Sequence, residues 1–133
     1  MGIWTALTRN VASTRPDAAD PRLRTRAYPV PYARVWDAAL QTAHAAPGWT
    51  VTSASAGAGT IQAEARTRLW GFTDDVAIHV ALDGSGMTRV DLRSSSRVGR
   101  ADLGTNARRV ARFLHALDAR LRLAGEGGAP ANR

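Results

Sequence analysis

Polar residues that could carry chemistry gather in two segments of this 133-residue chain. The first holds two consecutive carboxylates, Asp74 and Asp75, and the second is the run RSSSRVGRADLGTNARR from Arg93 to Arg109. Paired carboxylates can act as general acid and base, or can hold a metal ion. Guanidinium groups, hydroxyls and a helix N-terminus can instead bind an anion such as phosphate or a carboxylate. The residues therefore define two alternative chemistries.

Strand geometry argues against the catalytic pair. Neighbouring residues of a strand point to opposite faces, so Asp74 and Asp75 cannot converge on one atom. The anion site has its own difficulty, because Asp102 would place negative charge at the same helix N-terminus. We therefore expect no catalytic residue, and a structural network with a small-anion or ligand site as the leading functional alternative. The candidate structural or ligand-site residues are Phe72, Asp74, Asp75, Arg93, Ser94, Ser96, Arg97, Gly99, Asp102, Gly104, Asn106 and Arg109.

Composition narrows the remaining chemistry. The chain has no cysteine, which excludes disulfides, thiolate metal sites and a cysteine nucleophile. The histidines at positions 44, 79 and 115 fall on separate elements, so we expect no metal and no cofactor. No serine elbow, phosphate loop or dinucleotide turn is present. No apolar run approaches the ~18 residues that a membrane helix needs, and no export signal is recognisable, so we expect a cytoplasmic protein.

The net charge is +7, and all 18 basic residues are arginine. Clustered cations would suggest nucleic acid, because they gain affinity by releasing phosphate counterions. The arginines are scattered along the sequence, however, and abundant Ala, Gly and Arg are typical of a GC-rich genome. The aromatic residues are also not paired on an open sheet face, as single-strand readers require. These observations argue against a nucleic-acid partner and leave solubility as the safe inference.

Hydrophobic periodicity defines the elements that must position the candidate residues. Four runs alternate with period two and are separated by short glycine turns, which predicts an antiparallel meander with one apolar face. A strand and a helix precede the meander, and a long amphipathic helix follows it. We expect a two-layer α+β domain with a four- to five-stranded sheet covered on one face by two helices. This order resembles the helix-grip and TATA-binding-protein-like architectures. The expected strands lie near 23–30, 49–53, 61–68, 75–82 and 89–93, and the helices near 32–46 and 107–124.

The two ends of the chain are expected to lie outside this domain. Residues 1–22 form an N-terminal arm, with a short amphipathic segment over 1–11 and an irregular connection over 12–22. The segment 1–11 could cover part of the core or make a weak peripheral membrane contact. The domain itself is predicted over residues 23–124, followed by a flexible tail over 125–133.

A hairpin register follows from a three-residue loop at 83–85. It keeps both apolar sets on one face and places Asp75 opposite Arg93, which predicts a cross-strand ion pair. Asp74 has the opposite parity and points toward the helices, where its charge needs a partner. We expect that partner to be Arg97, in a loop formed by the serine run and returning over the sheet end.

Several segments resemble a known bacterial family, the domain-of-unknown-function family 1499. The likeness covers roughly residues 10–121, and the family pattern points to the same candidate positions. What it implies is limited, because the family has no established activity, substrate or cofactor. The segments that carry it are Asn10–Thr14, Tyr28–Pro31 ahead of Val35–Trp36, Pro47–Trp49, Arg66–Val76 and the run from Arg93 to Arg109.

The sequence thus predicts a non-enzymatic binding or accessory module. Its small-anion or ligand site would lie at the Asp74/Asp75–Arg93/Arg97 sheet edge. One alternative is a small hydrolase or isomerase that uses Asp74 in a cleft between sheet and helices. Another is a polyanion or nucleic-acid binder that uses the arginine face of the last helix.

Overall fold

The structure is a computed structural model that describes residues 11–67, 71–97 and 103–124. The strands and helices follow one another in the order that the sequence predicts, with one additional short strand at the start. The elements are β1 (Val11–Ser13), the 3-10 helix η1 (Pro21–Leu23), β2 (Arg26–Tyr28), α2 (Tyr32–Ala45), β3 (Trp49–Ser55), β4 (Thr60–Arg66), β5 (Thr73–Leu82), β6 (Thr88–Ser96) and α3 (Leu103–Ala124).

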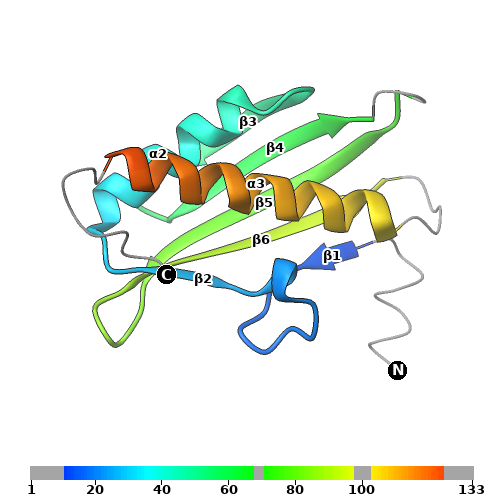
Figure 1. Ribbon diagram of the computed structural model, residues 1–133. Coiled ribbons are helices and arrows are strands. Elements are labelled where there is room, and N and C mark those ends of the chain that lie inside the picture. Colours follow the sequence, from blue (N-terminus) through cyan, green and yellow to red (C-terminus); the bar gives the residue numbers. More distant parts are fainter. Residues whose placement is uncertain (1–10, 68–70, 98–102, 125–133) are drawn as a thin grey trace.

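The described strands form one antiparallel sheet in the order β1-β6-β5-β4-β3, and β2 also pairs with β6. Both α2 and α3 lie on the same face of this sheet, and no described helix covers the other face, which we call the open face (Figure 1). The molecule is therefore a two-layer α+β domain, which confirms the fold class predicted from the sequence.

The core lies between the two layers because the apolar residues of each strand share one face. In β5 the burial alternates strictly, so that Val76, Ile78 and Val80 are buried while the residues between them are more exposed. The apolar stripe of α3 packs against this face, with Leu114 and Leu117 fully buried. A two-residue side-chain period on the strands and a 3.6-residue period on the helix thus meet in one core.

The sheet edge beside β6 differs from the prediction. Val11–Ser13 forms β1 and pairs with Arg93–Ser95 of β6, so the prediction of a helical stripe ending at Val11 and an irregular connection beyond it is wrong here. The three-residue β2 pairs only with Thr88–Val90, at the start of β6. Pairing with β1 satisfies backbone groups of β6 that would otherwise lie open at the edge. The wider division at 1–22, 23–124 and 125–133 stays a prediction.

Between β1 and β2 the chain leaves the sheet, and Asp91 of β6 holds both ends of this excursion. Its carboxylate accepts hydrogen bonds from the hydroxyls of Thr14 (2.7 Å) and Thr25 (2.5 Å) and from Arg89 (2.8 Å). Burial works to raise the pKa of Asp91, but the two hydroxyls and the guanidinium outweigh it and leave this pKa below its ordinary value. The short strands β1 and β2 therefore act together as one interrupted edge strand beside β6.

The hairpin between β5 and β6 corrects the predicted register by two residues. Its loop contains five residues, Asp83–Met87, because the Asp83 carboxylate accepts hydrogen bonds from the backbone N–H groups of Ser85 and Met87. Leu82 consequently pairs with Thr88. A shift of two residues preserves the faces, so the apolar sets still share one side.

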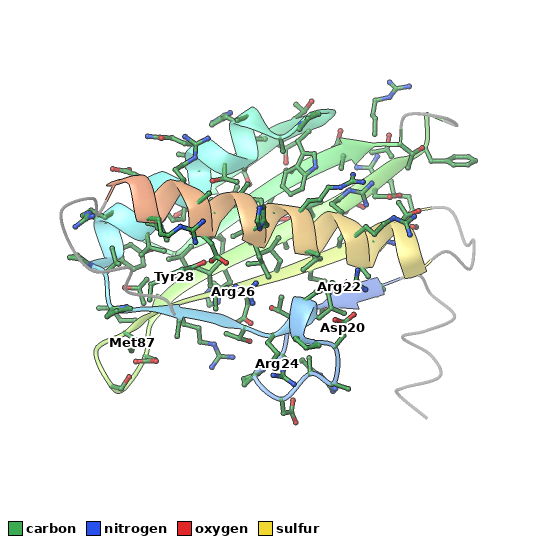
Figure 2. The ribbon with its side chains drawn as sticks, viewed as in Figure 1. Asp20, Arg22, Arg24, Arg26, Tyr28 and Met87 are labelled. Atoms are coloured by element: carbon green, nitrogen blue, oxygen red, sulfur yellow. The ribbon has the colours of Figure 1, made fainter. Side chains whose placement is uncertain are left out.

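A polar cluster of Tyr28, Arg26 and Asp118 joins β2 to α3. Tyr28 is fully buried, and its hydroxyl donates a 2.5 Å hydrogen bond to Asp118, which also pairs with Arg26 at 3.3 Å. Figure 2 shows Tyr28 and Arg26 on β2, next to α3. Burial raises the pKa of the Tyr28 phenol, and the hydrogen bond to Asp118 raises it further.

This cluster predicts a loss of stability in alkali. A phenol whose pKa is higher in the folded state stabilises the fold below its unfolded pKa, near 10, and this stabilisation is lost as the pH rises above that value. We expect a loss of about 1.4 kcal/mol per pH unit from Tyr28 above roughly pH 10. Urea unfolding between about pH 9 and pH 11 measures it. Tyr28→Phe should remove this component, and an unchanged pH dependence in Tyr28→Phe would contradict the assignment.

None of the helices in the described part of the chain combines the length and apolar character needed to cross a membrane.

Candidate functional site

Asp74, near the start of β5, faces the helices as its parity predicts. Its side chain is completely buried, between Ala65 of β4 and Ser96 of β6 in the sheet. The carboxylate accepts a hydrogen bond of 2.9 Å from the Nη1 atom of Arg109 on α3, whose side chain is 11% exposed. The predicted arginine partner therefore exists, but it comes from α3 rather than from the end of β6.

Two hydroxyls and an amide extend this ion pair into a network. The Ser94 hydroxyl donates to Oδ1 of Asn106 at 2.7 Å, and Nδ2 of Asn106 donates to the Ser96 hydroxyl at 3.0 Å. Nη1 of Arg109 also donates to Asn106 Oδ1 (2.9 Å) and Ser94 Oγ (3.2 Å). Ser94 and Asn106 are fully buried. The network thus fixes the first turns of α3 against the ends of β5 and β6, and we call it the corner network: Asp74, Ser94, Ser96, Asn106 and Arg109.

On the opposite, open face of the same sheet end, Arg97 joins two strands. Its guanidinium binds both oxygens of Asp75 on β5, at 2.8–3.2 Å, and reaches Glu64 on β4 at 2.7 Å. The hydrogen bonds that Arg97 donates to Asp75 and, with a smaller effect, to Glu64 raise the pKa of Arg97, so this cation stays protonated. All three side chains are about half exposed. One guanidinium is thus shared by two carboxylates, which leaves this triad with a net charge of −1 at the outer side of the corner.

Three sequence predictions about this corner are wrong, and two causes explain them: the length of β6 and the register of the β5–β6 hairpin. The serine run belongs to β6, which extends to Ser96, rather than to a loop. Arg97 consequently continues the strand alternation and reaches the open face, where it meets Asp75 instead of Asp74. With the corrected register, Asp75 lies opposite Ser95, and Arg93 lies opposite Ala77. The predicted Asp75–Arg93 and Asp74–Arg97 pairs are therefore replaced by Asp75–Arg97 and Asp74–Arg109.

The remaining candidates lie in different places. Phe72 is half-buried, and its backbone N–H donates to the Thr67 hydroxyl at 2.9 Å. Gly104 is exposed in the first turn of α3, and Arg93 is exposed on the open face of β6. Gly99 and Asp102 lie outside the described residues. The structure thus gathers seven of the twelve candidates at one corner, five in the corner network and two in the triad.

Sequence reasoning missed Glu64. The available signal was the alternation of β4, which places this carboxylate on the open face. Its register with β5 then brings Glu64 directly opposite Asp75. Among the described residues, no group of three or more His, Asp or Glu side chains is arranged to hold a metal ion.

The fold and the corner define a two-layer α+β domain in which the corner network joins a helix end to a sheet end. A family model described as "Protein of unknown function (DUF1499)" matches residues 6–117. The chain belongs to the DUF1499 family, which confirms the resemblance found in the sequence. No curated protein matches the chain.

Proposed function

We propose that the domain is a non-enzymatic binding module that takes a small anion on the open face of its sheet, at Arg93. The buried ion pair supports a binding role over catalysis. Asp74 has no exposed surface and is paired with Arg109, so it could act as an acid or base only after leaving this partner. A hydrolase or isomerase centred on Asp74 would need an opening of the corner network.

The observation that carries this proposal is the distribution of charge on the open face. Each carboxylate there has an arginine: Asp75 and Glu64 share Arg97, and Asp91 has Arg89. Arg93, on the same face of β6, makes no salt bridge within the described residues. Arg66 is also exposed without a salt bridge among the described residues, but it lies at the end of β4, so Arg93 is the cation without a salt bridge that lies in the middle of the sheet.

The neighbours of Arg93 suit a small carboxylate or phosphate. By strand pairing, Ala77 lies on one side of Arg93 and Ser13 on the other, so one neighbour is small and the other can donate a hydrogen bond. A guanidinium that binds an oxyanion with two parallel hydrogen bonds gives the strongest contact of this kind. Asp74, Asp75 and Arg97 then act as the scaffold that holds the sheet edge beneath the ligand.

Titration with phosphate and with acetate, followed by amide chemical shifts, tests the proposal. We expect perturbations centred on Arg93, and an Arg93→Gln variant that binds about tenfold or more weakly. Arg66→Gln is the matched control, because Arg66 is exposed and makes no salt bridge in the described part of the chain. An Arg93→Gln variant that binds as well as Arg66→Gln would refute the site, and so would a wild-type protein that binds neither anion.

A further inference from the structure

The outward side of α3 carries a row of cations. Arg108, Arg112, His115 and Arg122 are exposed, and at 3.6 residues per turn they fall within an arc of about 80°. The opposite side of the helix is the apolar stripe that packs on the sheet. From Arg108 to Arg122 the row extends about 21 Å along the helix axis. We call these four residues the outer row.

Nothing on α3 neutralises the outer row. None of its arginines makes a salt bridge in the part of the chain that the structure describes. The one acidic residue of α3 is Asp118, which is bound to Tyr28 and Arg26 on the sheet side. Arginines that are separated in the sequence thus converge in the fold, whereas Arg26, Arg89 and Arg97 at the sheet are each paired with a carboxylate.

The positive charge forms a line rather than a plane. The exposed residues of α2 at the corresponding spacing are Arg34, Asp37, Gln41 and His44, and the charges of the one arginine and the one aspartate cancel, so this row adds no net permanent charge. A planar anionic membrane would meet this helix as well as α3, and helices that bind membranes insert large apolar side chains. The large apolar residue that is exposed in the described chain is Leu82, at the β5–β6 hairpin rather than on a helix. A linear polyanion fits this surface better than a bilayer.

Among linear polyanions, the aromatic residues discriminate between single and double strands. Proteins that bind single strands stack the bases on exposed aromatic rings. Of the described tryptophans, Trp36 is buried and Trp49 stacks on Phe113, with ring centroids 5.5 Å apart. Contact with the phosphates of a duplex needs only cations. A sequence-independent duplex contact is therefore the chemistry that the outer row provides.

We propose that the outer row binds the phosphate backbone of double-stranded nucleic acid without reading its sequence. The outer row belongs to α3, which covers one face of the sheet (Figure 1), and the alternation of β6 places Arg93 on the other face. The inference is thus independent of the small-anion site, and either one can fail alone.

The test is the salt dependence of binding of the full chain to a fluorescein-labelled duplex of mixed sequence, followed by anisotropy. The slope of log K against log salt is negative, and its magnitude falls by about 0.9 for each phosphate contact that is lost. We expect the double variant Arg108→Gln/Arg112→Gln to reduce the magnitude of this slope by about 1.8. The triple variant that also carries Arg122→Gln should reduce it by about 2.7 in total. These positions are exposed, so melting curves should match that of the wild type.

The matched control is Arg34→Gln/Arg66→Gln, which removes the same charge from exposed positions outside the outer row. It should leave the slope unchanged. Equal loss in both double variants would overturn the proposal in favour of diffuse net charge. Tighter binding to a single strand than to the duplex would also overturn it. So would absence of duplex binding at low salt, with or without binding to vesicles of phosphatidylglycerol and phosphatidylcholine.

Discussion

Replacement of Arg109 by leucine is expected to destabilise the domain by about 3–5 kcal/mol, because it leaves a buried carboxylate without its cation. Asp74 has no exposed surface, and Arg109 approaches it to 2.9 Å. The same guanidinium also donates to Ser94 and Asn106, both fully buried, so the change removes several hydrogen bonds at once. Urea unfolding followed by circular dichroism measures the loss.

The double variant Asp74→Leu/Arg109→Leu separates the ion pair from its parts. A buried pair that is replaced as a whole by apolar residues often leaves stability unchanged, whereas removal of one partner does not. We therefore expect the double variant to be more stable than Arg109→Leu alone, with a large coupling between the two positions. Arg97→Leu is the control, since Arg97 forms a similar but solvent-exposed pair and should change stability little. If the losses of stability caused by Asp74→Leu and Arg109→Leu simply added up in the double variant, the two residues would not be coupled, which would contradict the corner network.

The layers of the fold could be predicted because hydrophobic periodicity reports burial directly. Val76, Ile78 and Val80 share one parity, and this parity alone places Asp74 toward the helices and Asp75 away from them. Both placements survive a register error of two residues, because a shift by an even number keeps every side chain on its face. Face and layer were thus accessible from the sequence.

The partners of the charged residues could not be predicted in the same way. They depend on loop length and strand end, which a few local hydrogen bonds decide. The Asp83 carboxylate closes a five-residue loop, and the extension of β6 to Ser96 turns Arg97 to the open face. The role of Arg109 depends further on how α3 is positioned above the sheet, which no local pattern encodes. Asp74 and Asp75 were each predicted to have an arginine partner, but which arginine it is depends on the three-dimensional structure.

The short strand β1 illustrates a second limit. Three residues, Val11–Ser13, are too few for periodicity to distinguish a strand from a helical turn. Their conformation is set by the unpaired backbone of β6, which lies about 80 residues later in the chain. Long-range backbone pairing therefore overrides the local amphipathic pattern at this position.

The second large effect is expected at Gly59, in the turn between β3 and β4. Its φ is +73°, and a Cβ atom there would lie 2.1 Å from the carbonyl oxygen of Val80. The same glycine accepts a 2.7 Å hydrogen bond from the Val80 N–H, so the turn is held against β5 at this point. Because the obstacle is backbone rather than a flexible side chain, Gly59→Ala should destabilise the domain by about 3 kcal/mol or more.

Gly57→Ala provides the control two residues earlier in the same turn. Gly57 has no positive φ, and no heavy atom lies within 4 Å of the Cβ that alanine would add. Alanine should there be neutral, or stabilise by about 0.4–1 kcal/mol, because it restricts the unfolded chain. Urea unfolding of the two variants distinguishes a specific contact of the turn with β5 from a general need for flexibility. If the two variants were equally stable, the backbone at Val80 would have moved to make room for the added methyl group. The register of β4 and β5 would then not depend on Gly59.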